Sequence, residues 1–194
     1  MTPNISEFLQ DIEDALEPYV IVFRRLTRMG NLSQSIFDQT MHPLDLVEET
    51  VAMRDWALDR VARDELLAEA CGHWCDYQTM FNWIDQIGAL QITCAFDIRT
   101  PPERRSAVLE LLAVLNERLG IGHFDMGAAD GLPAYRHALL LRGGSLSAEQ
   151  VEDMIDIALH ELDRFYPAFQ YVVWGNQSAQ TAVSSVVFET VGEA

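Results

Sequence analysis

Hydrophobic positions along most of the chain follow the spacing of helices or of strands. Apolar residues at helical spacing predict a helix that begins near Pro43, which suits a first helical position, and ends near Trp56. One face of this helix is marked by Leu44, Val47, Val51 and Leu58. Residues 65–71, 74–83 and 89–98 carry the apolar pattern typical of strands. The connections between these strands are too short for parallel crossovers, so the pattern predicts an antiparallel sheet.

The second half of the chain predicts further helices and strands. Thr100 is expected to cap a helix while Glu103 reaches back to it, and residues 121–126 and 134–141 predict two more strands. Ser147 and Gln150 form a capping box at the start of the next helix, which Pro167 should kink or break. Residues 178–191 predict a last helix. This order of elements predicts an α+β fold in which helices cover an antiparallel sheet.

The first 40 residues differ from the rest of the chain. They have a helical spacing of apolar residues as far as residue 28, which Pro18 interrupts, and then a polar stretch. We predict a helical N-terminal extension over residues 1–40 and a domain over residues 43–194, although Met41 would also serve as a translation start. Because the strong apolar periods lie in the later segment, we expect that segment to fold alone.

Charge narrows the classes of partner. The chain has 30 acidic residues and 13 basic ones, all of them arginine, for a net charge of −17. Such a charge repels phosphate backbones and anionic lipid surfaces, so neither nucleic acid nor a membrane is an expected partner. The chain shows no signal sequence, and its longest early apolar run, residues 19–23, is too short to span a bilayer. The sequence therefore predicts a cytoplasmic protein with reduced thiols.

Cys71, His73 and Cys75 are the most suggestive group for chemistry. On a continuous strand they would share one face and offer three of the four ligands of zinc. Gly72 favours a bend instead, and no second pair of ligands follows, so thiols without a metal are the favoured interpretation. A metal- or thiol-based sensor is the alternative. The scattered histidines and the absence of a nucleophile motif predict no catalytic residue, no cofactor and no enzymatic activity.

An aromatic series near residue 170 has two interpretations. Its members belong to a core helix or form part of a surface for a partner or a dimer: Phe165, Tyr166, Phe169, Tyr171 and Trp174. A helix bent at Pro167 would leave at least one ring exposed, with Tyr166 and Trp174 the strongest candidates. The acidic residues of the same helix would then suit a basic segment of the partner.

Several segments together resemble the YbjN-domain family of proposed bacterial sensory-transduction regulators. The resemblance covers residues 43–194 and is carried by these motifs: 74–77 (WCDY), 88–97 (GALQITCAFD), 102–105 (PERR), 116–119 (NERL), 122–125 (GHFD), 136–144 (RHALLLRGG), 164–170 (RFYPAFQ) and 189–194 (ETVGEA). It implies a fold like that of type III secretion chaperones, with the order α-β-β-β-α-β-β-α. That chaperone class is small, acidic and commonly dimeric, and it binds segments of client proteins.

The resemblance and the residues lead to one functional prediction. The chain is expected to be a non-enzymatic protein-interaction module, chaperone-like or regulatory, that binds a protein partner through an acidic and aromatic surface. A second copy of the chain, in a homodimer, is one candidate for that partner. The family brings no catalytic residue or cofactor to carry over, and a shared fold does not transfer a function.

Overall fold

A computed structural model describes residues 42–142 and 144–191, and the predicted helical extension over residues 1–40 lies outside them. The described elements, in chain order, are these: α2 (Pro43–Ala52), β1 (Leu58–Ala62), β2 (Glu65–Cys71), β3 (Asp76–Ile84), β4 (Ala89–Ala95), the 3-10 turn η2 (Pro102–Arg104), α3 (Arg105–Asn116), β5 (His123–Met126), β6 (Pro133–Leu140), α4 (Ala148–Val173) and α5 (Ala179–Val191). The α+β class predicted from the sequence is confirmed.

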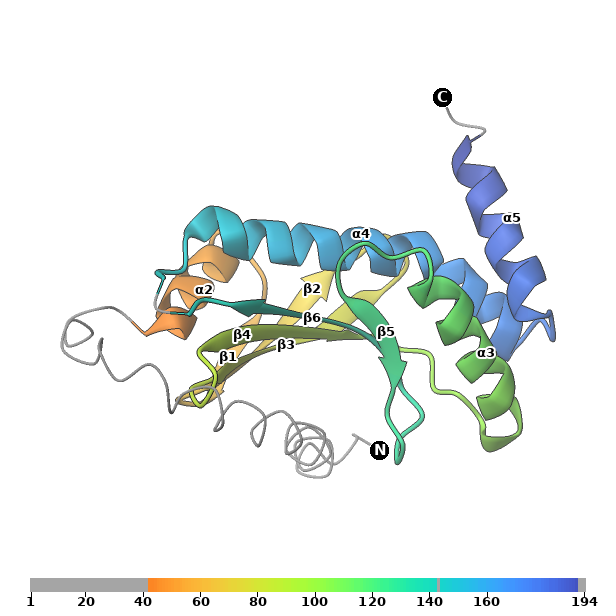
Figure 1. Cartoon of the computed structure of the whole chain (residues 1–194), viewed down its shortest axis with the longest axis horizontal. Helices are drawn as coiled ribbons and strands as arrows, with labels where there is room; N and C mark the ends of the chain where they lie inside the picture. The colour runs from red at the N-terminus through yellow and green to blue at the C-terminus, as the bar shows by residue number, and fades with distance from the viewer. Residues whose placement is uncertain (1–41, 143, 192–194) are drawn as a thin grey trace.

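The strands form one open antiparallel sheet in the order β1-β2-β3-β4-β6-β5. Helices α2 and α4 lie along one face of this sheet, and α3 and α5 pack beyond its end against α4 (Figure 1). Compared with the strand order that the chaperone resemblance implies, the chain has one more strand before α3 and one more helix at its end.

The core lies between the sheet and the helices. The strand register places Leu66, Phe81, Ile92 and Cys94 on the face that α2 and α4 cover, and all four are buried. Helix α4 turns an apolar stripe to the same layer, because its buried residues recur every three or four positions. This face is therefore the apolar centre of the domain.

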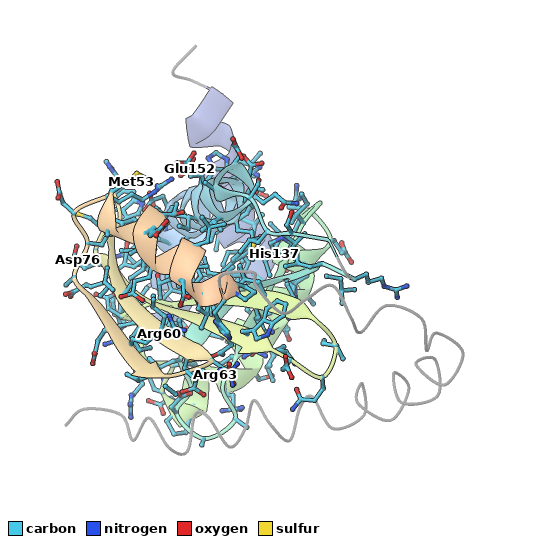
Figure 2. All side chains as sticks on the ribbon, turned by 90° about the vertical axis from the view of Figure 1, so that its left-hand side faces the viewer. Met53, Arg60, Arg63, Asp76, His137 and Glu152 are labelled. Carbon is cyan, nitrogen blue, oxygen red and sulfur yellow. The ribbon has the colours of Figure 1, made fainter. Side chains whose placement is uncertain are left out.

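Helix α2 is held in place by a side-chain cap at its start and by an arginine from strand β1. Pro43 occupies the first turn as predicted, and His42 caps it: its Nδ1 accepts from the Leu44 N–H at 3.3 Å, and its own N–H donates to Asp45. Arg60 reaches from β1 to Asp45 and Glu48 of the helix, each at 3.2 Å. Figure 2 shows Arg60 beneath the helix from this end of the sheet. These contacts fix α2 over the β1–β2 hairpin.

Two predictions for helix starts and ends are wrong. The first helix ends at Ala52 and not near Trp56, so Leu58 begins strand β1 instead of continuing the helical face. Thr100 does not cap the next helix: its hydroxyl has no hydrogen-bond partner, and η2 begins after Pro101 with no side-chain cap. By contrast, the Ser147–Gln150 capping box is confirmed, with reciprocal hydrogen bonds of 3.0 and 3.3 Å.

Pro167 does not break helix α4. The helix runs for 26 residues from Ala148 to Val173 with Pro167 inside it. A proline inside a helix removes one hydrogen bond, so this continuity needs a compensating contact, which is described below. In the described part of the chain, no helix has the length and apolar character needed to cross a membrane.

Deleting residues 1–40 should leave a protein with a cooperative thermal transition. The described core cluster is contributed by residues between Leu44 and Val186, so the truncated chain keeps it whole. Thermal unfolding followed by circular dichroism tests this expectation. A broad, non-cooperative transition would place the extension within the core and contradict the domain boundary.

Candidate functional site

The five aromatic residues predicted as a partner surface differ in where they lie. Phe165 and Phe169 are fully buried and Tyr166 is 5% exposed, whereas Tyr171 is half-buried and Trp174 is 63% exposed. Phe169 packs on Phe96 with ring centroids 4.6 Å apart, and Phe165 on Phe124 at 5.9 Å. Since α4 continues past Pro167, it keeps the first three rings on its inward face. Of the two rings expected to be exposed, only Trp174 is.

The turn between β2 and β3 packs against helix α4. It closes with a hydrogen bond of 3.1 Å from the Gly72 N–H to the carbonyl of Cys75. A Cβ on Gly72 would lie 2.1 Å from the ring of Tyr77, so only glycine permits this close approach. Gly72 thus bends the chain here, as its position in the sequence suggested, and Cys71 and Cys75 do not lie on one continuous strand.

Asp163 of α4 accepts hydrogen bonds from this turn and from the start of β3. One of its carboxylate oxygens accepts from the His73 N–H at 2.8 Å and from the Tyr77 hydroxyl at 2.7 Å. Burial, and then the Asp163 carboxylate, raise the pKa of Tyr77, so its hydroxyl remains a donor at neutral pH. The two bonds join residues that are 90 and 86 positions apart in the chain.

Trp74 makes the contact that Pro167 requires. Because proline has no N–H, the carbonyl of the residue four positions earlier, Asp163, loses its helical donor. The indole N–H of Trp74 donates to that same carbonyl at 2.8 Å. The turn therefore supplies from outside the hydrogen bond that the helix lacks, which explains how α4 continues through Pro167.

The indole ring of Trp74 also stacks on the ring of Tyr166, with centroids 6.0 Å apart and planes within 5°. The hydroxyl of Tyr166 in turn donates to Asp97 at 2.8 Å. Trp74 is nonetheless 48% exposed, so one face of a firmly held ring meets solvent. We call Trp74, Tyr77, Asp97, Asp163 and Tyr166 the aromatic–carboxylate cluster.

Replacing Trp74 by phenylalanine should cost about 1–3 kcal/mol of stability, because the Asp163 carbonyl then has no donor. The same change should cost less in a Pro167→Ala background, where residue 167 regains an N–H. Urea unfolding of the two single variants and the double variant measures this difference. Equal costs in both backgrounds would show that Trp74 and Pro167 do not compensate one another.

The three free cysteines, two of which belong to the predicted sensor group, lie in different surroundings. Cys71 is exposed and Cys75 half-buried, while Cys94 is buried in β4. Hydrogen bonding to Asp76 and its charge raise the pKa of Cys71; burial, followed by the charge of Asp97, raises that of Cys75 to about 11. Figure 2 shows Asp76 at the margin of the molecule. Protonated thiols are weak nucleophiles, and the described residues contain no group of three or more side chains placed to hold a metal.

Neutralising Asp76 should make Cys71 more reactive. Without the carboxylate, the pKa of Cys71 falls and its thiolate fraction at pH 8 rises, so Asp76→Asn should speed the alkylation of Cys71. Mass spectrometry of the Cys71 peptide after timed exposure to iodoacetamide measures the rate. An unchanged rate would mean that Asp76 does not control this thiol.

The cluster brings together residues that sequence reasoning treated separately. It joins the turn after β2, the start of β3, the second residue after β4 and the second half of α4. Four of its five members were missed as site residues, since no periodicity links positions so far apart: Trp74, Tyr77, Asp97 and Asp163. The available signal was that residues 74–77, 88–97 and 164–170 are among the motifs that carry the family resemblance.

This fold, with an open antiparallel sheet carrying helices on one face, defines an α+β domain. A model of the YbjN family, described as "Putative bacterial sensory transduction regulator", matches residues 43–171. The match spans more than half of the chain, so the protein belongs to the YbjN family. The family is described as regulators and not as enzymes.

One solved structure that the chain is similar to is a crystal structure of YbjN from E. coli, described as "a putative transcription regulator". The identity is 16%, the TM-score is 0.43, and the alignment covers 62% of this chain and 85% of that one. A search of curated proteins found no match.

Proposed function

We propose that this protein is a non-enzymatic, regulatory or chaperone-like module that binds a protein partner through an acidic and aromatic surface centred on Trp74. The observation that carries the proposal is the exposure of Trp74: 48% of this side chain meets solvent although stacking and a hydrogen bond hold it in place. A ring that is already ordered loses little conformational freedom on binding, and tryptophan is enriched among residues that dominate binding energy.

The chemistry around Trp74 indicates the kind of partner. Asp76 and Asp97 are exposed next to the turn, and Asp163 is partly exposed beneath it. With a net charge of −17 on the whole chain, a segment rich in lysine or arginine would approach this surface favourably. Trp174, 63% exposed at the end of α4, provides a second aromatic contact on the same helix.

Affinity capture with matched baits tests the proposal. The protein and its Trp74→Ala, Trp174→Ala and Leu109→Ala variants are used as baits in a lysate of the source organism. Leu109 is the control, since it is 50% exposed on α3 and lies outside the cluster. We expect one protein retained by the unmodified bait and the control, and lost or reduced with Trp74→Ala, while circular dichroism shows that each bait is folded.

Three outcomes would contradict the proposal. One is capture of the same proteins by all four baits, and another is capture of none. The third is stoichiometric zinc or iron in the purified protein by elemental analysis, which would favour the sensor formed by Cys71, His73 and Cys75. Sedimentation of the unmodified protein, and of Trp174→Ala, tests separately whether the partner is a second copy.

A further inference from the structure

The face of the sheet turned away from α2 and α4 has unusual side chains for a surface. The register places Met80 opposite Thr93 and Asn82 opposite Gln91 on this face. No helix of the described residues lies on it (Figure 1). Even so, Thr93 is 1% exposed, Met80 4%, Gln91 7% and Asn82 8%. The side chains at the centre of this face are therefore largely inaccessible although no described helix covers them.

Three polar atoms on this face have no hydrogen-bond partner. They are the Asn82 Oδ1, the Gln91 Oε1 and the Thr93 Oγ1, all buried. Buried polar atoms in folded proteins are paired in the great majority of cases, because an unpaired one costs free energy. The Asn82 and Gln91 oxygens only accept hydrogen bonds, and the Thr93 hydroxyl both accepts and donates, so a group rich in donors would satisfy all three.

A cavity of about 390 Å³ lies on the same face, across strands β1 to β4 and the loop before β6. Its floor is apolar and includes Leu67, Met80 and Leu132. Of the three residues with an unpaired oxygen, Thr93 lines the cavity, while Asn82 and Gln91 lie on the same face outside its lining. Its charged members are Asp59, Glu69 and Asp130, and none of the described lining residues is basic. The cavity therefore fits an apolar segment that carries positive charge.

We propose that residues 19–29 of this same chain occupy the cavity. That stretch, YVIVFRRLTRM, contains the longest early apolar run and three of the thirteen arginines. Each arginine offers five N–H donors and no acceptor, which suits both the unpaired Thr93 oxygen and the acidic rim of the cavity. The apolar residues of the stretch suit the floor.

The length of the chain permits this docking. As a helix, the eleven residues would measure about 16 Å. Crossing from β1 to β4 takes three strand spacings, or about 14 Å. The described chain begins at His42, beside Asp64 in the β1–β2 turn, where the two side chains lie 3.1 Å apart. Twelve residues separate residue 29 from His42 and reach about 40 Å when extended, which exceeds the length of the strands between the turn and the cavity.

A second copy of the described domain suits the cavity less well. The chain as a whole carries 30 acidic residues against 13 arginines, so two acidic surfaces would have to meet at an acidic rim. Residues 19–29 carry three arginines and no acidic residue, and they are covalently linked to the domain, so their effective concentration at the cavity is high.

Photo-crosslinking in the full-length protein tests the proposal. A photoreactive p-benzoylphenylalanine is placed at position 78, because Gln78 is exposed and lines the cavity. The same group at position 109 of α3 serves as the control. Mixing ¹⁴N- and ¹⁵N-labelled protein before irradiation distinguishes links within a chain from links between chains. We expect links from position 78 to residues 19–29 of the same chain, and none to that stretch from position 109.

Charge substitutions complete the experiment. Changing Arg24, Arg25 and Arg28 together to glutamine should lower the yield from position 78 about tenfold, the effect of losing one charge-assisted hydrogen bond. Arg118→Gln, on an exposed arginine of the described domain, should leave it unchanged. A second probe at position 67 repeats the measurement should the first variant fold poorly. Links only to other segments, links between chains, or no link at all would overturn the proposal.

Discussion

Phe169→Ala is expected to lower the free energy of unfolding by about 3–5 kcal/mol. Phe169 is fully buried and packs on Phe96 and Phe124, with centroid distances of 4.6 and 5.6 Å. Truncation leaves a cavity between α4 and the sheet that neighbouring rings cannot fill without moving. Urea unfolding measures the change. The midpoint urea concentration should fall, and the dependence of the free energy of unfolding on urea concentration should change little.

Trp174→Ala is the matched control for this prediction. It removes a larger aromatic side chain from the same helix, but one that is 63% exposed at the helix end. Its effect on stability should be below about 1 kcal/mol, the usual size for exposed positions. If both variants lost the same stability, the inward and outward positions assigned to these rings would be wrong.

The sequence predicts best those features that depend on neighbours along the chain. The Ser147–Gln150 capping box involves residues three positions apart, and the structure has both of its hydrogen bonds. Strand β2 matches its predicted range, Glu65–Cys71, because its apolar alternation and the turn before it are local signals. The antiparallel class follows from the short connections in the same way.

Of the predicted kink or break at Pro167, the break does not occur, because α4 continues through the proline. The rule that proline ends a helix counts only donors from within that helix. Here the donor to the Asp163 carbonyl is the indole of Trp74, 89 residues earlier in the chain. No periodicity shows that the two segments meet. Once the helix continues, Phe165, Tyr166 and Phe169 stay on one buried face, so the predicted five-ring surface is divided.

Thr100 illustrates a second limit. A threonine three residues before a glutamate matches the capping pattern, yet the prolines at 101 and 102 favour a 3-10 turn, and the hydroxyl has no partner. Pattern matching identified the position of the helix and the proline in its first turn. It did not establish which atoms make the cap.

Asp163→Ala is expected to cost about 2–4 kcal/mol of stability, because it leaves a buried hydroxyl without its acceptor. The Tyr77 side chain is fully buried, and its hydroxyl donates to Asp163 at 2.7 Å. The N–H of His73 loses the same acceptor. The turn should then open more readily, which limited proteolysis between β2 and β3 would detect as faster cleavage.

Asp156→Ala provides the comparison on the same helix. Asp156 forms an ion pair with Arg54 at 2.8 Å, but its side chain is 64% exposed, and an exposed pair of this kind contributes about 0–1 kcal/mol. The two substitutions remove the same group from α4 and differ in what that group holds. In a Tyr77→Phe background the cost of Asp163→Ala should fall, since no hydroxyl is left unpaired. A cost that is unchanged in that background would mean that Asp163 stabilises the domain by another route than the turn between β2 and β3.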